Sequence, residues 1–111
     1  MLKKVERISS KKEFAEVKNK GEMRAADLFS IIWMNPPMLT AKEGQRKFGA
    51  IISKKISKKA VERNQIRRRL FEAVRNNIEM FPQGFRGIFL VKRNILDKKM
   101  EEIEKCLKRL F

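Results

Sequence analysis

The sequence predicts one β-sheet with helices packed on it, in the order helix, two or three strands, helix, strand, helix. Runs rich in branched and aromatic residues indicate the strands, and apolar residues repeated at helical spacing indicate the helices. With 111 residues the chain fits one domain, 1–111, which is large enough to bury a real core but too small for two domains. One body should therefore carry the whole function.

The first helix is predicted to begin at a capping box. Ser10 and Glu13 have the S-x-x-E spacing in which each side chain binds the backbone amide of the other residue. This helix would place Phe14 and Val17 on one face and stop near Gly21 after about three turns.

Residues 27–34 predict a strand, because they are rich in branched and aromatic residues, and the strand is apolar on both faces. It is followed by Asn35-Pro36-Pro37, which neither a helix nor a central strand would tolerate. Either face could line a groove, and burial of both faces is equally compatible with the pattern. Positions 35–46 then predict a loop. Alternation divides the strand into two sets: Leu28, Ile32 and Met34 point one way, and Phe29, Ile31 and Trp33 the other.

The rest of the chain predicts a strand at 48–53, a helix from about 57 or 58 to 77, a buried strand at 87–91 and a last helix beginning near Asp97. The strand–helix–strand order implies a crossover between parallel neighbours. The apolar stripes are Ile66, Leu70, Ala73 and Val74 on the long helix, and Met100, Ile103, Leu107 and Leu110 on the last one.

The chain carries 28 Lys and Arg against 13 acids, a formal charge of +15. Such an excess destabilises a compact fold by self-repulsion unless a polyanion binds it, so nucleic acid is the favoured partner over an anionic membrane or an acidic protein. A single cysteine, Cys106, excludes an intramolecular disulfide and suits a reducing compartment, where it should act as a small apolar filler. No apolar run approaches the length of a membrane span, and we expect a cytoplasmic protein that binds no membrane.

Histidine is absent, which removes the commonest general base and metal ligand from any chemistry carried by this chain. The sequence shows no carboxylate pair, nucleophile triad or metal cluster. We therefore expect no catalytic residue, no metal ligand and no small-molecule substrate.

The stretch 54–70 has eight cations in its first sixteen positions and one acid, Glu62. Cations at a helix amino terminus oppose the helix dipole, and a merely solvated face would interleave acids at i, i+4. Phosphates would reverse this conflict, because free amides and cations would then favour the same anions. Nearly every outward position is cationic, with few base-reading side chains, which favours structured RNA over the DNA major groove.

The order of these residues is similar to the signature of the bacterial ribonuclease P protein subunit. The matching segments are Phe48-Gly49 through Ser53-Lys54-Lys55, and Lys59-Ala60-Val61-Glu62-Arg63-Asn64-Gln65-Ile66-Arg67-Arg68-Arg69-Leu70. Departures from the family pattern stand at Lys18, Ser57, Gln65 and Phe71.

The resemblance implies a two-layer α+β fold like a ribosomal-protein domain, with a left-handed βαβ crossover. It also implies an accessory subunit of an endonuclease: the RNA subunit cuts precursor tRNA with Mg²⁺, and the protein binds that RNA and guides the 5′ leader through a cleft between the first helix and the sheet. The alternative is a ribosomal or general structured-RNA-binding protein.

The resemblance assigns two sets of residues, which we combine with the physical interpretation of a cationic rim beside an apolar groove. The set expected to bind the catalytic RNA is Lys54, Lys55, Lys58, Lys59, Arg63, Asn64, Gln65, Arg67, Arg68 and Arg69. The set expected to line the leader cleft is Phe14, Phe29, Ile31, Trp33, Phe48 and Ile52.

Overall fold

The computed structural model describes residues 7–8, 11–34, 46–81 and 84–110. Their elements follow in the order α1 (Lys11–Lys20), β1 (Glu22–Ala25), β2 (Phe29–Met34), β3 (Lys47–Ile51), α2 (Ala60–Asn76), η3 (Ile78–Met80), β4 (Arg86–Val91), η4 (Arg93–Ile95) and α3 (Met100–Lys108). The four strands form one sheet in the order β1-β2-β4-β3. The predicted α+β class is confirmed.

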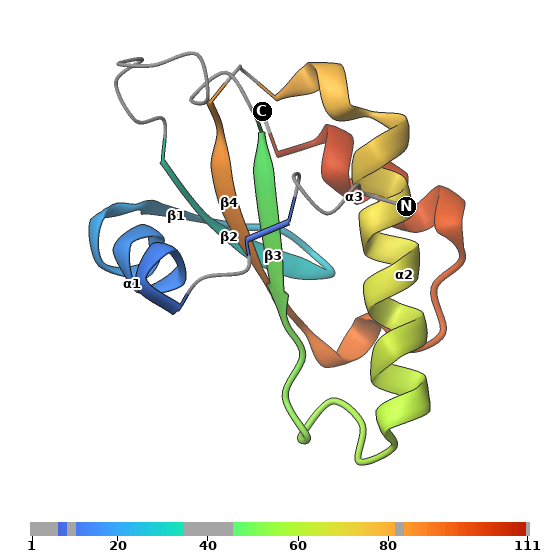
Figure 1. Cartoon of the computed structure of the whole chain (residues 1–111). Coiled ribbons are helices and arrows are strands. Elements are labelled where there is room, and N and C mark those ends of the chain that lie inside the picture. The colour runs from blue at the N-terminus through green and yellow to red at the C-terminus, as the bar shows by residue number, and fades with distance from the viewer. Residues whose placement is uncertain (1–6, 9–10, 35–45, 82–83, 111) are drawn as a thin grey trace.

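Helices cover the two faces of the sheet unequally. Figure 1 shows α1 alone on one side and α2 with α3 on the other. β3 and β4 are parallel neighbours joined through α2, so α2 is the predicted crossover helix. Both strands run downward in Figure 1, with β3 in front of β4 and α2 to the right, which makes the crossover left-handed, against the usual preference.

The main core lies between the sheet and the pair α2 and α3. Phe48 packs its ring against Phe81 at a centroid distance of 4.9 Å, and Phe29 meets Phe89 edge-on at 5.2 Å. The predicted stripe of α2 is buried here, as are most of the residues expected on α3. Phe71, one of the departures from the family pattern, is 3% exposed and belongs to this core.

Three strands precede α2, within the predicted two or three, but the residues of β1 could not be located from the sequence, because all four are exposed and show no apolar alternation. One element boundary needs correction. The last helix begins at Met100 instead of Asp97, with Lys99 at its N-cap, because η4 and a turn take up the intervening residues. Ser10 of the predicted capping box and the loop 35–45 lie outside the described residues.

Candidate RNA interface

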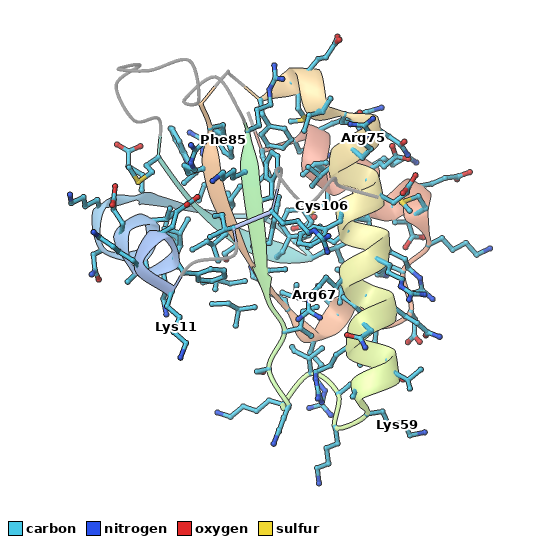
Figure 2. The ribbon with its side chains drawn as sticks, in the orientation of Figure 1. Lys11, Lys59, Arg67, Arg75, Phe85 and Cys106 are labelled. Carbon is cyan, nitrogen blue, oxygen red and sulfur yellow. The ribbon has the colours of Figure 1, made fainter. Side chains whose placement is uncertain are left out.

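The segment between β3 and α2 carries the densest group of exposed cations in the described part of the chain. All four lysines of the predicted set are exposed, and Lys59 projects from the start of α2 in Figure 2. We call the exposed members of that set the basic surface: Lys54, Lys55, Lys58, Lys59, Asn64, Gln65 and Arg68. Arg63, Arg67 and Arg69 are half-buried.

Ser57 orders the loop that presents the lysines. Its hydroxyl accepts a hydrogen bond from the amide of Lys59 at 3.2 Å, and its carbonyl accepts one from Nη1 of Arg63 at 2.8 Å. A turn before it is closed by the amide of Ile56 donating to the carbonyl of Ser53 at 3.0 Å. Arg63 therefore holds the loop in place as well as adding charge beside it.

Asn64 and Arg67 form a second ordered pair, one turn into α2. Nη1 of Arg67 donates to Oδ1 of Asn64 at 3.1 Å. Because guanidinium is a planar fork with five donors, one such contact orients it and leaves further N–H groups for an anion. This arrangement is suited to a phosphate lying along the helix start.

The electrostatics of this segment favour an anionic ligand. The N-cap residue, Lys59, makes no side-chain capping hydrogen bond within the described residues, so the helix amino terminus presents uncapped amides. Within 46–81, Glu62 is the one acid in the first turn of α2, and no described carboxylate is seen to pair with the four lysines. The cations and the positive end of the dipole thus repel one another until an anion binds.

The α1 side of the sheet is organised in three cross-strand rows. Two rows lie beneath α1 and hold Ile32, Ile88 and Gly49 in one, and Met34, Arg86 and Lys47 in the other. The third row is half-buried at every position, like the row of Met34, but it lacks the ion pairs to Glu13 of α1 that Lys47 and Arg86 form, and we call it the open row: Ser30, Leu90 and Ile51. Phe14 of α1 is also half-buried on this side. The open row and Phe14 therefore make an accessible, mainly apolar surface.

The assignment of the leader cleft is corrected by this arrangement. Phe29, Ile31 and Phe48 are 0% exposed and Ile52 is 8% exposed, all in the core beneath α2 and α3. They point away from α1 and have almost no surface to offer a ligand, so they do not line a cleft between α1 and the sheet.

Trp33 belongs to the same core face, where it is half-buried and stacked on Phe85 at 5.9 Å. Leu28, expected on the face of Ile32, also joins this core. Of the predicted cleft residues, only Phe14 lies on the α1 side. Ile51 and Leu90 lie on the α1 side and were not among the predicted cleft residues; the available signal was Gly49, since a glycine within a strand often marks the close approach of another group.

An ion-pair cluster attaches α1 to the sheet. The carboxylate of Glu13 lies 3.4 Å from Nζ of Lys47 and 3.5 Å from Nε of Arg86. These cations belong to β3 and β4, so one α1 side chain binds two strands. The cluster lies at one end of the covered rows, and the open row lies at the other.

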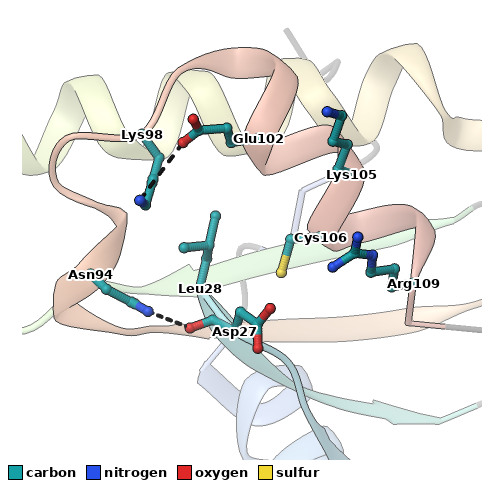
Figure 3. Close-up of a pocket in the computed structure, with 8 residues that line it drawn as sticks. All are labelled: Asp27, Leu28, Asn94, Lys98, Glu102, Lys105, Cys106 and Arg109. Atoms are coloured by element: carbon teal, nitrogen blue, oxygen red, sulfur yellow. Dashed lines mark hydrogen bonds and ion pairs between the residues drawn. The ribbon is translucent and has the colours of Figure 1, made fainter.

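A separate hollow of about 310 Å³ lies between the β1–β2 turn, η4 and α3. Figure 3 shows Arg109 and the thiol of Cys106 directed toward it, with Lys98 paired to Glu102 at 3.9 Å. Its charged residues have both signs and its elements differ from those of the basic surface, so it does not extend that surface. Cys106 is 7% exposed and acts as part of the core.

The described residues contain no group of three or more acidic, Cys or His side chains placed to hold a metal ion. Among the described helices, none combines the length and the apolar character that crossing a bilayer requires. What the arrangement offers is a cationic surface on one side and an apolar surface on the other, joined by the loop after β3.

Comparisons with known proteins agree with the sequence signature. The family model for ribonuclease P matches residues 2–111. The ribonuclease P protein component of Pelotomaculum thermopropionicum is 30% identical over 99% of this chain and 93% of its own length, and that of Rippkaea orientalis is 30% identical over 99% and 87%.

Solved structures share the fold. The RNase P protein of Staphylococcus aureus superposes with a TM-score of 0.79 at 22% identity, covering 95% of this chain and 91% of that one. The protein from Thermotoga maritima gives 0.80 at 19% identity, with 95% and 94% covered. The match of the family model across nearly the whole length, together with the curated relatives, decides the assignment: this chain belongs to the ribonuclease P protein family.

Proposed function

We propose that this chain is the protein component of ribonuclease P and works in the cytoplasm. It binds RNase P RNA through the basic surface and the 5′ leader of precursor tRNA through Phe14 and the open row. The RNA subunit cuts the leader and holds the Mg²⁺ that this reaction uses, so no residue of this chain is assigned to metal binding or catalysis.

The basic surface is the observation that carries the proposal. Four exposed lysines lie at the amino terminus of α2, where they destabilise the free helix and favour bound phosphate, and Arg68 extends the exposed charge along the helix. Arg63 and Asn64 are engaged in contacts that order this surface. An RNA backbone supplies anions at regular spacing without requiring base-specific contacts, which matches a surface of cations with few base-reading groups.

The open row supports leader binding on the α1 side. Unpaired nucleotides bind surfaces that combine stacking platforms with nearby cations. Ile51 ends β3, and Lys54 follows three residues later, a distance of about 10 Å along an extended chain. A single strand on the open row would therefore continue onto the basic loop, close to RNA bound at α2.

The test is reconstitution with the cognate RNase P RNA. At low Mg²⁺, adding this protein should stimulate 5′ cleavage of precursor tRNA, and the holoenzyme should bind precursor more tightly than mature tRNA. Absence of stimulation with a correctly folded RNA would refute the proposal. Equal binding of precursor and mature tRNA would instead favour a general RNA-binding protein, and equally tight duplex DNA at the same salt would favour a DNA-compacting one.

A further inference from the structure

Gly49 has no side chain for a reason that lies on α1. A Cβ built at Gly49 would lie 2.7 Å from Cε2 and 2.9 Å from Cζ of Phe14, closer than real Cβ atoms approach other atoms. The backbone does not require glycine here, because within the described residues positive φ is confined to Gly84, at 80°. The space above Gly49 is filled by the Phe14 ring.

The neighbours of Gly49 on β3 show what this contact does. Lys47, two residues earlier on the same face, is paired with Glu13 and so fixes the start of α1. Ile51, two residues later on that face, belongs to the open row. Gly49 thus lies between the point where α1 is attached and the point where the sheet becomes accessible.

Val17 helps to hold α1 in place, so the Phe14 ring cannot make room for a new side chain by a shift of the whole helix. Val17 is 1% exposed and packs with Ile8, Ile32 and Ile88 beneath α1. Because these side chains and the Glu13 ion pairs hold α1, a group added at position 49 would displace the Phe14 ring and not the whole helix. The ring is half-buried, so it has an open direction in which to move.

We propose that Gly49 is a positioning residue for the leader surface: it lets the Phe14 ring lie against β3, next to Ile51, so that ring and open row form one continuous platform for an unpaired nucleotide. The proposal rests on the proposed leader binding. A substitution of Gly49 keeps the Phe14 ring but displaces it, whereas a substitution of Phe14 removes the ring itself, so only the former tests the position of the ring.

The test compares Gly49→Ala, Phe14→Ala and the double variant in holoenzymes with the cognate RNA. The readout is the ratio of dissociation constants for mature and precursor tRNA under conditions that do not permit cleavage. Stacking of a base on an aromatic ring contributes ~1–3 kcal/mol, so each single variant should lower this preference about tenfold. Affinity for RNase P RNA should stay within about twofold of the wild type, a margin below ~0.5 kcal/mol.

The double variant should be no worse than Phe14→Ala alone, because Gly49 is proposed to act only through the ring. An additive loss would overturn this role, as would a Gly49→Ala protein that keeps the wild-type preference. Should Gly49→Ala not fold, Phe14→Leu keeps an apolar contact on α1 without the ring, and retention of the preference in that variant would also overturn the proposal.

The outcomes distinguish the two proposals. A wild-type holoenzyme that prefers precursor tRNA, with a Gly49→Ala holoenzyme that does so equally, leaves leader binding standing and removes Gly49 from it. A wild-type holoenzyme with no preference overturns leader binding, and the role of Gly49 with it.

Discussion

Arg68→Ala is the most direct probe of the basic surface. Arg68 is exposed on α2, whereas Arg63 and Arg67 are half-buried and hold Ser57 and Asn64. Replacing Arg68 therefore removes a charge with little effect on the local structure. Arg109→Ala is the matched control, because Arg109 is exposed at the end of α3, outside the basic surface, and both variants lower the formal charge from +15 to 15 − 1 = +14.

The magnitude follows from counterion release. Each phosphate contact contributes about 0.9 to the slope of log affinity against log salt concentration. Between roughly 50 mM and 200 mM salt, a fourfold change, one contact thus accounts for a factor of about 3.5 in affinity. Arg68→Ala should lose this factor, so its affinity disadvantage for RNase P RNA should be about 3.5-fold larger at the low salt concentration than at the high one.

The assay is a salt titration of the dissociation constant for RNase P RNA, measured by filter binding or fluorescence. The slope should fall by about 0.9 for Arg68→Ala and remain near the wild-type value for Arg109→Ala. If both variants flatten the slope equally, the effect comes from net charge alone and the location of the basic surface is wrong. An unchanged slope for Arg68→Ala would remove Arg68 from the phosphate contacts.

Three further predictions test other parts of the structure. Phe48→Ala should lower the free energy of unfolding by ~3–5 kcal/mol, because Phe48 is 0% exposed. Ile51→Ala, at a half-buried position of the open row, should lower it by about 1 kcal/mol and also reduce the preference for precursor tRNA. Urea unfolding measures the stabilities and tRNA binding the preference, and the reverse pattern would contradict the assignment of the two faces of β3. Glu13→Gln should destabilise the protein by about 1 kcal/mol through loss of the pairs with Lys47 and Arg86, while the exposed Glu16→Gln changes stability by less than ~0.5 kcal/mol; equal effects in thermal unfolding would argue against the cluster. Cys106, 7% exposed, should react with a thiol reagent at least tenfold more slowly in native protein than in denatured protein, an order-of-magnitude expectation for a buried thiol. Equal rates would show that the hollow between the β1–β2 turn, η4 and α3 opens and exposes the thiol.

The leader cleft shows where prediction from sequence fails. In β3 the two alternating sets are Phe48 with Ala50, and Lys47 with Gly49 and Ile51, and apart from Lys47 at the start of the strand both are apolar, because helices cover both faces of the sheet. A strand of this kind gives no polar face to orient it, and a shift of one residue exchanges the two sets. The larger side chains were predicted to line the cleft, but the main core buries these same side chains, such as Phe29 and Phe48.

The long helix could be predicted much better. α2 has a single apolar stripe, so Ile66, Leu70 and Val74 determine its buried face, and the exposure of Asn64 and Arg68 follows from a period of 3.6 residues. β1 could not be found in the same way, because a fully exposed edge strand leaves no periodic pattern.

The sequence by itself determined the excess of positive charge, the family signature and the outward face of α2, since charge and helical periodicity are properties of the chain alone. Only the tertiary structure decided which face of the sheet meets α1, because that choice depends on how Glu13 and Phe14 dock onto Lys47, Arg86 and Gly49 of distant strands. Contacts between residues this far apart in sequence arise from packing and pairing register, neither of which alternation within one strand can specify.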